Sequence, residues 1–340
     1  MKLPPETSIV ADSLCKRFGR TEAIRDLSFT VKHGEIVGFL GPNGAGKSTT
    51  LRILTGVLPA TSGRLWVCGK AVPWHPAEIR NRIGYMPESN PLPEDMRVVE
   101  YLRFRARIKG IPRNRRKARI EQAMEVCELH RKARRRIIGT LSKGFRQRVG
   151  IADAILAAPS ITILDEPTIG LDPHQVIAIR RLLDNLRGQT TVIFSSHILS
   201  EVEISCDRIL ILNQGTLVAA GTAAELRREF LPGCHFRVEV AGETDRLGEE
   251  MRRLGEDWSV EIHPQPDGEF REISLINRTN GADGEQVLRE LFQEKNLRIR
   301  SFHRIQPSLE DIFLTATRRS WELSQDDLAA VAPTRKATRK

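Results

Sequence analysis

The segment Gly41–Thr49, with the sequence GPNGAGKST, restricts the fold of this chain more than any other stretch. It follows the apolar run Ile36–Leu40, which predicts a parallel strand buried on both faces, and apolar residues resume with helical spacing from Leu51. A glycine-rich loop between a strand and a helix turns its backbone N–H groups inward at a helix N-terminus. The segment therefore predicts a phosphate-binding loop in an α/β fold. The alternative, a glycine-rich turn that contains Lys-Ser by chance, is disfavoured by the flanking strand and helix.

The residues of this loop have distinct expected roles. Its three glycines can adopt positive φ without a Cβ penalty. Lys47 adds a cation to the β- and γ-phosphates of a nucleotide, and Ser48 offers its hydroxyl to Mg²⁺. The candidates for contact with the nucleotide are Gly41, Pro42, Asn43, Gly44, Ala45, Gly46, Lys47, Ser48 and Thr49.

A second apolar run, Ile161–Leu164, ends in two carboxylates at the edge where a parallel sheet exposes its binding crevice. We expect Asp165 to be an outer ligand of Mg²⁺ and Glu166 to orient or deprotonate an attacking water. A pair of ordinary strand-end acids is the alternative.

A third run, Thr191–Phe194, leads through two serines to His197 at the same predicted edge. A histidine in this place is expected to contact the γ-phosphate, although a lone histidine is more often structural. Asp172 and Pro173 predict the N-cap and first turn of a helix. We include Asp172 among the nucleotide-site candidates, although helix capping alone would explain it.

The segment Leu141–Arg148, with the sequence LSKGFRQR, predicts a second anion-binding helix terminus. Ser142 and the amide of Gly144 precede a helix whose apolar residues share one face and which ends at Pro159. The residues themselves do not say which anion this terminus serves.

The motifs GPNGAGKST, LSKGFRQR, ITILDEPTIGLDP and SSH occur in this order, and with them the chain resembles the ATP-binding subunit of an ABC transporter across Ile9–Arg228. The resemblance implies that Ser142 and Gly144 bind the γ-phosphate of ATP held by the phosphate loop of an opposite subunit. It further implies a head-to-tail dimer, with itself or with a paralogous ATPase subunit, that powers an integral-membrane permease. The implied cofactors are ATP and Mg²⁺.

Three further positions are compared with the family pattern. Phe18 resembles the aromatic residue that stacks on adenine, and a core phenylalanine is the alternative. Glu88 stands where the family most often has glutamine, as a candidate for contact with nucleotide and Mg²⁺. Lys143 departs from the commoner LSGG; positive φ would strain it by about 1 kcal/mol, and otherwise its ammonium can lie near phosphate. Glu88, Lys143 and the segment Pro307–Leu314 together resemble the pattern of the type-2 ABC exporters, in particular that of the gliding-motility-associated ATPases.

A chain of 340 residues predicts one large and one smaller domain. After an ATPase domain over 8–231, strands and helices alternate as β-α-β-β-α-β, the ferredoxin-like order, over 234–306. We expect a regulatory or dimer-supporting role there. A docking helix over 307–323 and a disordered tail over 324–340 complete the prediction. The helix is expected to start with a capping-box-like pair, Ser308 and Asp311, and to carry Leu309, Ile312 and Phe313 on one face. The predicted elements of the smaller domain are strand His235–Val240, helix Thr244–Leu254, strand Trp258–His263, strand Phe270–Asn277, helix Gly284–Glu294 and strand Leu297–Ile305.

The formal net charge of +10 is concentrated in Arg103–Arg136, which holds 14 Lys/Arg against 3 Glu. A solvated helical face is the simplest interpretation of most of these residues. Phe104 is the only aromatic residue in the span, which disfavours a nucleic-acid surface. The resemblance implies a mixed central sheet and a helical subdomain between Glu88 and the LSKG segment that faces the permease. The basic span would then lie toward the membrane, where its cations could assist docking at an anionic bilayer.

The sequence predicts a cytosolic protein at the inner face of the membrane. The five scattered cysteines form no C-x-x-C pair, and no run of about 18 apolar residues predicts a membrane span. A soluble ABC ATPase acting on nucleic acid or ribosomes is a second class of function, disfavoured by the single phosphate loop and the absence of long heptad arms. A non-hydrolysing regulator is a third class, which Glu166 disfavours. The transported substrate is not indicated.

Overall fold

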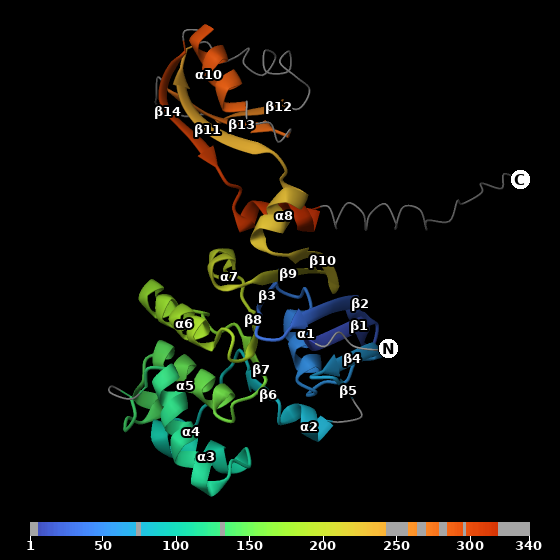
Figure 1. Ribbon diagram of the computed structural model, residues 1–340, viewed down its shortest axis with the longest axis vertical. Coiled ribbons are helices and arrows are strands. Elements are labelled where there is room, and N and C mark those ends of the chain that lie inside the picture. Colours follow the sequence, from blue (N-terminus) through green and yellow to red (C-terminus); the bar gives the residue numbers. More distant parts are fainter. Residues whose placement is uncertain are drawn as a thin grey trace, which may run out of the picture. The chain divides into compact units, whose positions relative to one another are not determined.

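The computed structural model describes residues 6–72, 76–129, 133–242, 258–263, 270–278, 284–294 and 297–318. Internal contacts divide the chain into two compact units, and the boundary between them lies after Thr222, with the second unit over Ala223–Asp326. Helix α8 (Ala223–Phe230) therefore groups with the second unit, whereas the sequence-based boundary followed residue 231. Figure 1 shows the elements of each unit.

The first unit is built on a six-stranded sheet with the order β10-β9-β3-β8-β7-β6. Only the pair β10 and β9 is antiparallel, so the sheet is mixed, as expected. Strands β3, β7 and β8 are buried at every position, which is why each reads as a continuous apolar run. The six strands are β3 (Ile36–Leu40), β6 (Ile83–Met86), β7 (Ile161–Asp165), β8 (Thr191–Ser195), β9 (Arg208–Asn213) and β10 (Thr216–Gly221).

A four-stranded antiparallel sheet with the order β2-β1-β4-β5 shares a hydrophobic core with the central sheet. The ring of Phe29 on β2 meets the ring of Phe39 on β3 edge-on, with centroids 5.4 Å apart. This contact helps to fix the position of the strand that leads into the phosphate loop. The four strands are β1 (Thr7–Phe18), β2 (Thr21–Lys32), β4 (Ser62–Val67) and β5 (Lys70–Val72).

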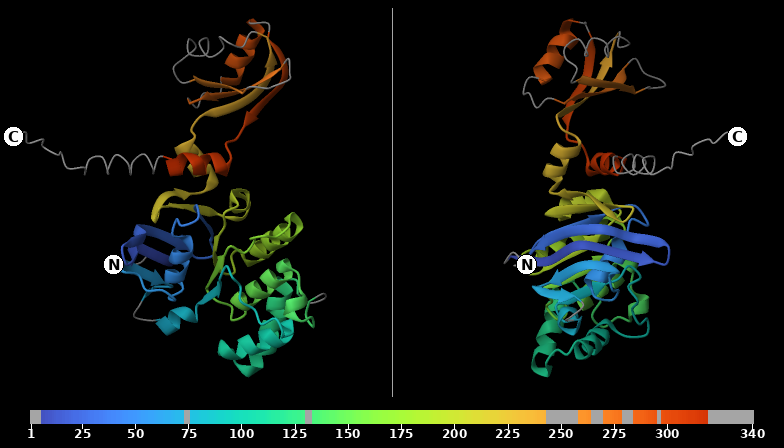
Figure 2. Two further views of the ribbon diagram at one scale, coloured as in Figure 1. Left: turned by 180° about the vertical axis from the view of Figure 1, so that it is seen from behind. Right: turned by 90° about the vertical axis from the view of Figure 1, so that its right-hand side faces the viewer.

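Three helices, α3, α4 and α5, pack on one another as the predicted helical subdomain, and they lie together as one cluster in Figures 1 and 2. Buried Asp153 on α5 ties the subdomain together, since its carboxylate pairs with Arg105 of α3 at 2.9 Å. The helices of the first unit are α1 (Lys47–Leu54), α2 (Pro76–Arg80), α3 (Val98–Ile108), α4 (Arg113–Val126), α5 (Lys143–Ile155), α6 (Pro173–Leu186) and α7 (Leu199–Ser205), with a 3₁₀ turn at Ile138–Thr140.

The second unit contains an antiparallel sheet with the order β12-β13-β11-β14, which is the ferredoxin-like order predicted from the sequence. Its core includes Phe236, Trp258 and Phe292. The predicted helix Thr244–Leu254 and the predicted tail 324–340 lie outside the described residues. The elements are β11 (Cys234–Ala241), β12 (Trp258–His263), β13 (Arg271–Asn277), α10 (Gly284–Glu294) and β14 (Arg298–Ile305).

A last helical stretch, residues 309–318, follows the second sheet. The predicted capping box is present: the backbone N–H of Ser308 donates to Asp311 Oδ2 at 2.9 Å, and the N–H of Asp311 donates to Ser308 Oγ at 3.2 Å. Leu309 and Ile312 of the predicted apolar face are buried, and Phe313 is half-buried. Within the parts of the chain that the structure describes, no helix is both long and apolar enough to cross a membrane.

Candidate active site

The phosphate loop joins β3 to α1 in the strand–turn–helix arrangement predicted for it. Gly44 and Gly46 have φ of +82° and +99°, as expected for glycines that turn the backbone toward a ligand. Gly41 does not have positive φ, so our explanation for that glycine was wrong. A Cβ on Gly41 would lie 2.5 Å from the backbone oxygen of Leu212 on β9, so close approach of two backbones requires glycine there.

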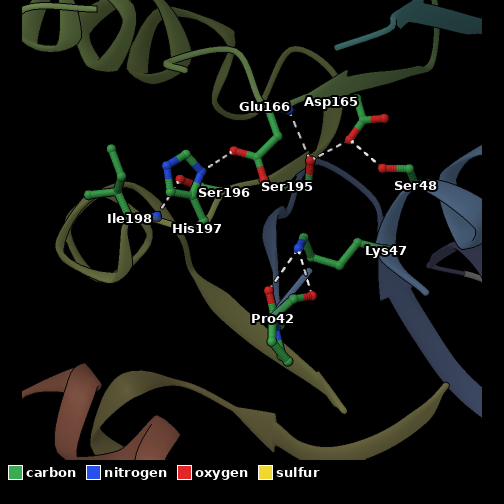
Figure 3. A network of polar contacts seen from close by, with 10 residues as sticks. Pro42, Lys47, Ser48, Asp165, Glu166, Ser195, Ser196, His197 and Ile198 are labelled. Carbon is green, nitrogen blue, oxygen red and sulfur yellow. Dashed lines mark hydrogen bonds and ion pairs between the residues drawn. The ribbon is translucent and has the colours of Figure 1, made fainter. Parts of the chain in front are cut away.

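Lys47 is the first residue of α1, and it is buried, with 6% of its surface exposed. Its ammonium donates to the backbone oxygens of Gly41 and Pro42, at 2.7 and 3.3 Å (Figure 3). The cation therefore lies over its own loop, where the phosphates of a nucleotide are expected.

Asp165 ends strand β7, and its carboxylate meets two hydroxyl groups from other elements (Figure 3). Ser48 Oγ on α1 donates to Asp165 Oδ1 at 3.4 Å, and Ser195 Oγ donates to the same oxygen at 2.7 Å. Hydroxyl and carboxylate oxygens are the ligand types that Mg²⁺ prefers, so Ser48 and Asp165 fit a magnesium site. No group of three or more His, Cys, Asp or Glu side chains suited to a metal occurs among the described residues.

Ser195 is a residue of the site to which the sequence analysis assigned no role. It is fully buried at the end of β8, beside Asp165 in the parallel register. Besides bonding Asp165, its Oγ accepts a hydrogen bond from the backbone N–H of Glu166 at 2.9 Å. The signal was present in the sequence, because neighbouring parallel strands that end in Asp and Ser place these side chains next to each other.

Glu166 follows β7 with a positive φ of +50°, a conformation that strains a residue with a side chain by about 1–2 kcal/mol. Its carboxylate is 9% exposed, and its Oε2 lies 2.7 Å from Nδ1 of His197 (Figure 3). His197 is 50% exposed, so it forms the open side of the pair. The structure thus brings together Lys47, Asp165, Glu166 and His197 at one edge of the sheet, as the sequence analysis expected of their strands.

Ser142 is the N-cap residue of α5, with φ −63° and ψ 160°. Its side chain is exposed and makes no cap hydrogen bond to its own helix. Gly144 is buried against α6: a Cβ there would lie 2.5 Å from Oε1 of Gln175. Lys143 begins the helix and has no positive φ, so the strain considered for it does not arise.

Glu88 and Lys143, the two departures from the family pattern, line the same cavity of about 840 Å³. Asp165 also lines this cavity, so the cavity reaches the carboxylate of the expected magnesium site. Tyr85 is another lining residue of this cavity. Burial raises its pKa, and the negative charges of Asp165 and Glu88 raise it further. No local pattern around Glu88 or Lys143 indicated that the two departures share a cavity.

Two other candidates have clear positions. Asp172 caps α6, and its Oδ1 accepts a hydrogen bond from the N–H of Gln175 at 3.0 Å, which confirms the predicted capping role. Phe18 ends β1 and is 49% exposed, so the alternative that it belongs to the core is wrong. The ammonium of Lys16 lies 5.1 Å from the centre of its ring.

Two protein-family models match the chain. The model described as "ABC transporter" matches residues 24–169, and the model described as "ATP-binding protein DrrA1-3-like, C-terminal domain" matches residues 221–317. The first match lies within the first unit, and the second covers most of the second unit.

Two known relatives with resistance or transport names match the chain over nearly their full length. The linearmycin resistance ATP-binding protein LnrL of Bacillus subtilis (strain 168) is 32% identical over 317 residues, covering 91% of this chain and 98% of the relative. The bacitracin transport ATP-binding protein BcrA of Bacillus licheniformis is 33% identical over 310 residues, covering 91% and 96%. A solved dimeric structure of a bacterial ABC transporter cassette has a TM-score of 0.57 at 25% identity, covering 63% of this chain and 98% of that one.

Proposed function

The chain belongs to the family of ABC transporter ATP-binding subunits, and we propose that it works as a head-to-tail dimer with two ATP molecules between the subunits. It is the ATP-hydrolysing subunit of an exporter. Each site combines the phosphate loop of one copy with Ser142 and Gly144 of the other. The second subunit is a copy of this chain or a paralogous ATPase subunit. A separate integral-membrane permease carries the substrate across the membrane.

The observation that carries this proposal is the free hydroxyl of Ser142. Side chains at an N-cap normally accept a hydrogen bond from the first turn of their own helix, and Ser142 makes no such bond. The exposed hydroxyl therefore remains available beside the first N–H groups of α5, at the positive end of a helix dipole. Such a terminus fits a phosphate supplied by another molecule, and the dimeric relative supports that arrangement.

In the proposed reaction, the carboxylate of Glu166 orients the attacking water and accepts its proton. Ser195 acts as a positioning residue, because it holds both the Asp165 carboxylate and the backbone of Glu166. His197 restrains the Glu166 carboxylate and lies near the γ-phosphate. When a nucleotide binds, the ammonium of Lys47 exchanges its hydrogen bonds to the backbone oxygens of Gly41 and Pro42 for contacts with the β- and γ-phosphates.

Mg²⁺, when bound, neutralises charge on the β- and γ-phosphates. Ser48 and Asp165 would hold it. Glu88 lines the cavity that reaches Asp165, so we propose that its added negative charge strengthens metal binding there. A Glu88→Gln variant would then need more Mg²⁺ for half-maximal ATPase activity, while its nucleotide affinity without metal stays unchanged.

We propose that the cavity lined by Glu88 also receives the permease. Val57 at its rim is 65% exposed, and Pro91 and Leu92 add apolar surface. The basic stretch Arg103–Arg136 would then lie toward the cytoplasmic face of the membrane, as the resemblance to the family implies. A variant with reversed charges at five positions of this stretch tests the role of the charges, and unchanged recruitment of that variant to membranes would contradict it. The five positions are Arg131, Lys132, Arg134, Arg135 and Arg136, of which the first two lie outside the described residues.

We also propose that the chain belongs to the type-2 ABC exporters and, within them, to the gliding-motility-associated subgroup. Glu88, Lys143 and the segment Pro307–Leu314 support it. The relatives named above concern linearmycin resistance and bacitracin transport, so the finer form depends on these residues alone. The second unit contains no predicted catalytic residue, and we assign it a regulatory or dimer-supporting role.

A mixing experiment tests the shared site. Lys47→Ala removes the cation from the phosphates and should abolish nucleotide binding by the phosphate loop. Ser142→Arg should block the opposite terminus while leaving that loop intact. Each variant alone should hydrolyse ATP poorly, whereas an equal mixture should regain activity, because the mixed dimer contains one site in which both halves are intact.

The mixture separates a shared site from a site within one chain. If both groups served a nucleotide in the same chain, the mixture would show only the average of the two inactive variants, and the dimer proposal would fail. A mixture of Lys47→Ala with Glu166→Gln is the matched control. Both of those changes affect the same half-site, so it should stay inactive.

A further inference from the structure

A second concave site lies in the helical subdomain, apart from the residues assigned to ATP. It is a cavity of about 270 Å³ lined by residues of α3 and α4 and by Arg134. Buried Val99 and Ile120 contribute apolar surface to it. The charged residues around it are Arg103, Arg113, Arg116, Lys117, Arg134 and Glu121.

The single acid of the cavity is already engaged. Glu121 forms two short hydrogen bonds with Arg134, at 2.6 and 2.7 Å, so these two charges offset each other. Arg116 donates from Nε to the backbone oxygen of Ile111 at 2.6 Å, which fixes its guanidinium beside the cavity. Arg103, Arg113 and Lys117 make no hydrogen bond or ion pair with any residue that the structure describes.

The lining of the cavity carries more cations than acids. Arg113 begins α4, whose first turn contains no acidic residue, so cations stand at the positive end of the helix dipole. Side chains from two helices bring further positive charge into the same cavity, and like charges repel. Arg103, Arg113 and Lys117 are exposed, so solvent weakens their mutual repulsion, and they differ from other surface cations in lining one cavity together.

We propose that this cavity binds a phosphate group with two or more negative charges. Arg side chains match phosphate oxygens through paired hydrogen bonds, and Lys117 adds a compact charge. None of the lining residues is aromatic, so nothing there would stack on a nucleotide base. A soluble diphosphate compound and the headgroup of an anionic lipid share this chemistry.

The test uses the full chain with Lys47→Ala, which disables the phosphate loop, and inorganic pyrophosphate as the probe. Calorimetric titration should show binding that weakens as salt is raised. Adding Arg103→Gln, Arg113→Gln and Lys117→Gln should weaken it by about ten-fold or more. The matched control carries Arg107→Gln, Arg181→Gln and Arg228→Gln, which are exposed cations outside the cavity, and it should bind like its parent.

A second arm separates the two sources of phosphate. Vesicles of phosphatidylcholine containing phosphatidic acid should compete with pyrophosphate if the natural ligand is a headgroup, and should not compete if it is soluble. Absence of pyrophosphate binding, or an equal loss in the control variant, would overturn the proposal. With Lys47 restored, the cavity variant should keep its basal ATPase activity. Because the test measures pyrophosphate binding, its result does not depend on whether ATP is bound between two subunits.

Discussion

Nδ1 of His197 lies 2.7 Å from Oε2 of Glu166, and the two residues come from the ends of neighbouring parallel strands. The carboxylate is nearly buried, whereas the imidazole is half exposed. The pair therefore holds a carboxylate in a fixed direction at the open edge of the sheet, next to the phosphate loop. A carboxylate held in this way needs little reorganisation when a nucleotide enters.

We expect Glu166→Gln to leave ATP binding intact and to reduce turnover by ~10²–10⁴-fold, because the amide can bond His197 but cannot accept the proton of water. The variant should also accumulate as an ATP-bound dimer. Phosphate release measures the first effect, and size-exclusion chromatography with ATP and Mg²⁺ measures the second. Turnover at the wild-type rate would remove Glu166 from the role of base.

We expect Ser195→Ala to impair both catalysis and folding stability. The change leaves the N–H of Glu166 without its buried partner, a loss of about 1–3 kcal/mol in the free energy of unfolding. It also frees the Asp165 carboxylate, so the Mg²⁺ concentration for half-maximal ATPase activity should rise. Ser205→Ala, at another buried serine outside the site, is the control and should not change the Mg²⁺ dependence. The same Mg²⁺ dependence in both variants would contradict a positioning role for Ser195.

Gly41→Ala and Gly144→Ala should differ in effect although each places a Cβ 2.5 Å from an oxygen. The oxygen near Gly41 belongs to the backbone of β9, which cannot move away, so we expect destabilisation by about 1–3 kcal/mol and loss of nucleotide binding. The oxygen near Gly144 ends the Gln175 side chain, which can rotate. Chemical denaturation and nucleotide titration compare the two variants, and an equal effect would contradict this reasoning.

The stability of the second unit should decrease in mild acid because of His235. Burial lowers the pKa of this histidine, although the carbonyl of Leu231 and the charge of Asp311 oppose the shift. The unfolded chain takes up a proton as the pH falls below about 6.5, whereas the folded unit does not. The contribution of neutral His235 to the free energy of unfolding is therefore fully present above pH about 6.5 and declines below it.

His235→Gln should remove this part of the pH dependence. Hydrogen exchange of β11 and β14 in the wild type and the variant, compared at the same pH, measures it without interference from intrinsic exchange rates. If the difference in protection between the two proteins were the same at pH about 5.5 and about 7.5, His235 would not be the group responsible.

Much of the fold and part of the site followed from local patterns. The apolar run Ile36–Leu40 predicted a buried strand because a strand covered on both faces needs apolar side chains at every position. The loop after it predicted a phosphate site because glycines and a Lys-Ser pair at a helix start have few other uses. The order of elements in the second unit predicted its sheet, since short connections leave few topologies.

The sequence by itself determined which chemical groups are present and at which ends of which elements they stand. Only the tertiary structure decided which groups meet. Ser195 bonds Asp165 because the register of β7 and β8 sets them side by side, and Gly41 is glycine because β9 passes close to it. Glu88 and Lys143 share a cavity because the helical subdomain packs against the sheet. Contacts between residues far apart in the chain depend on how the layers pack, and a local pattern does not encode that packing.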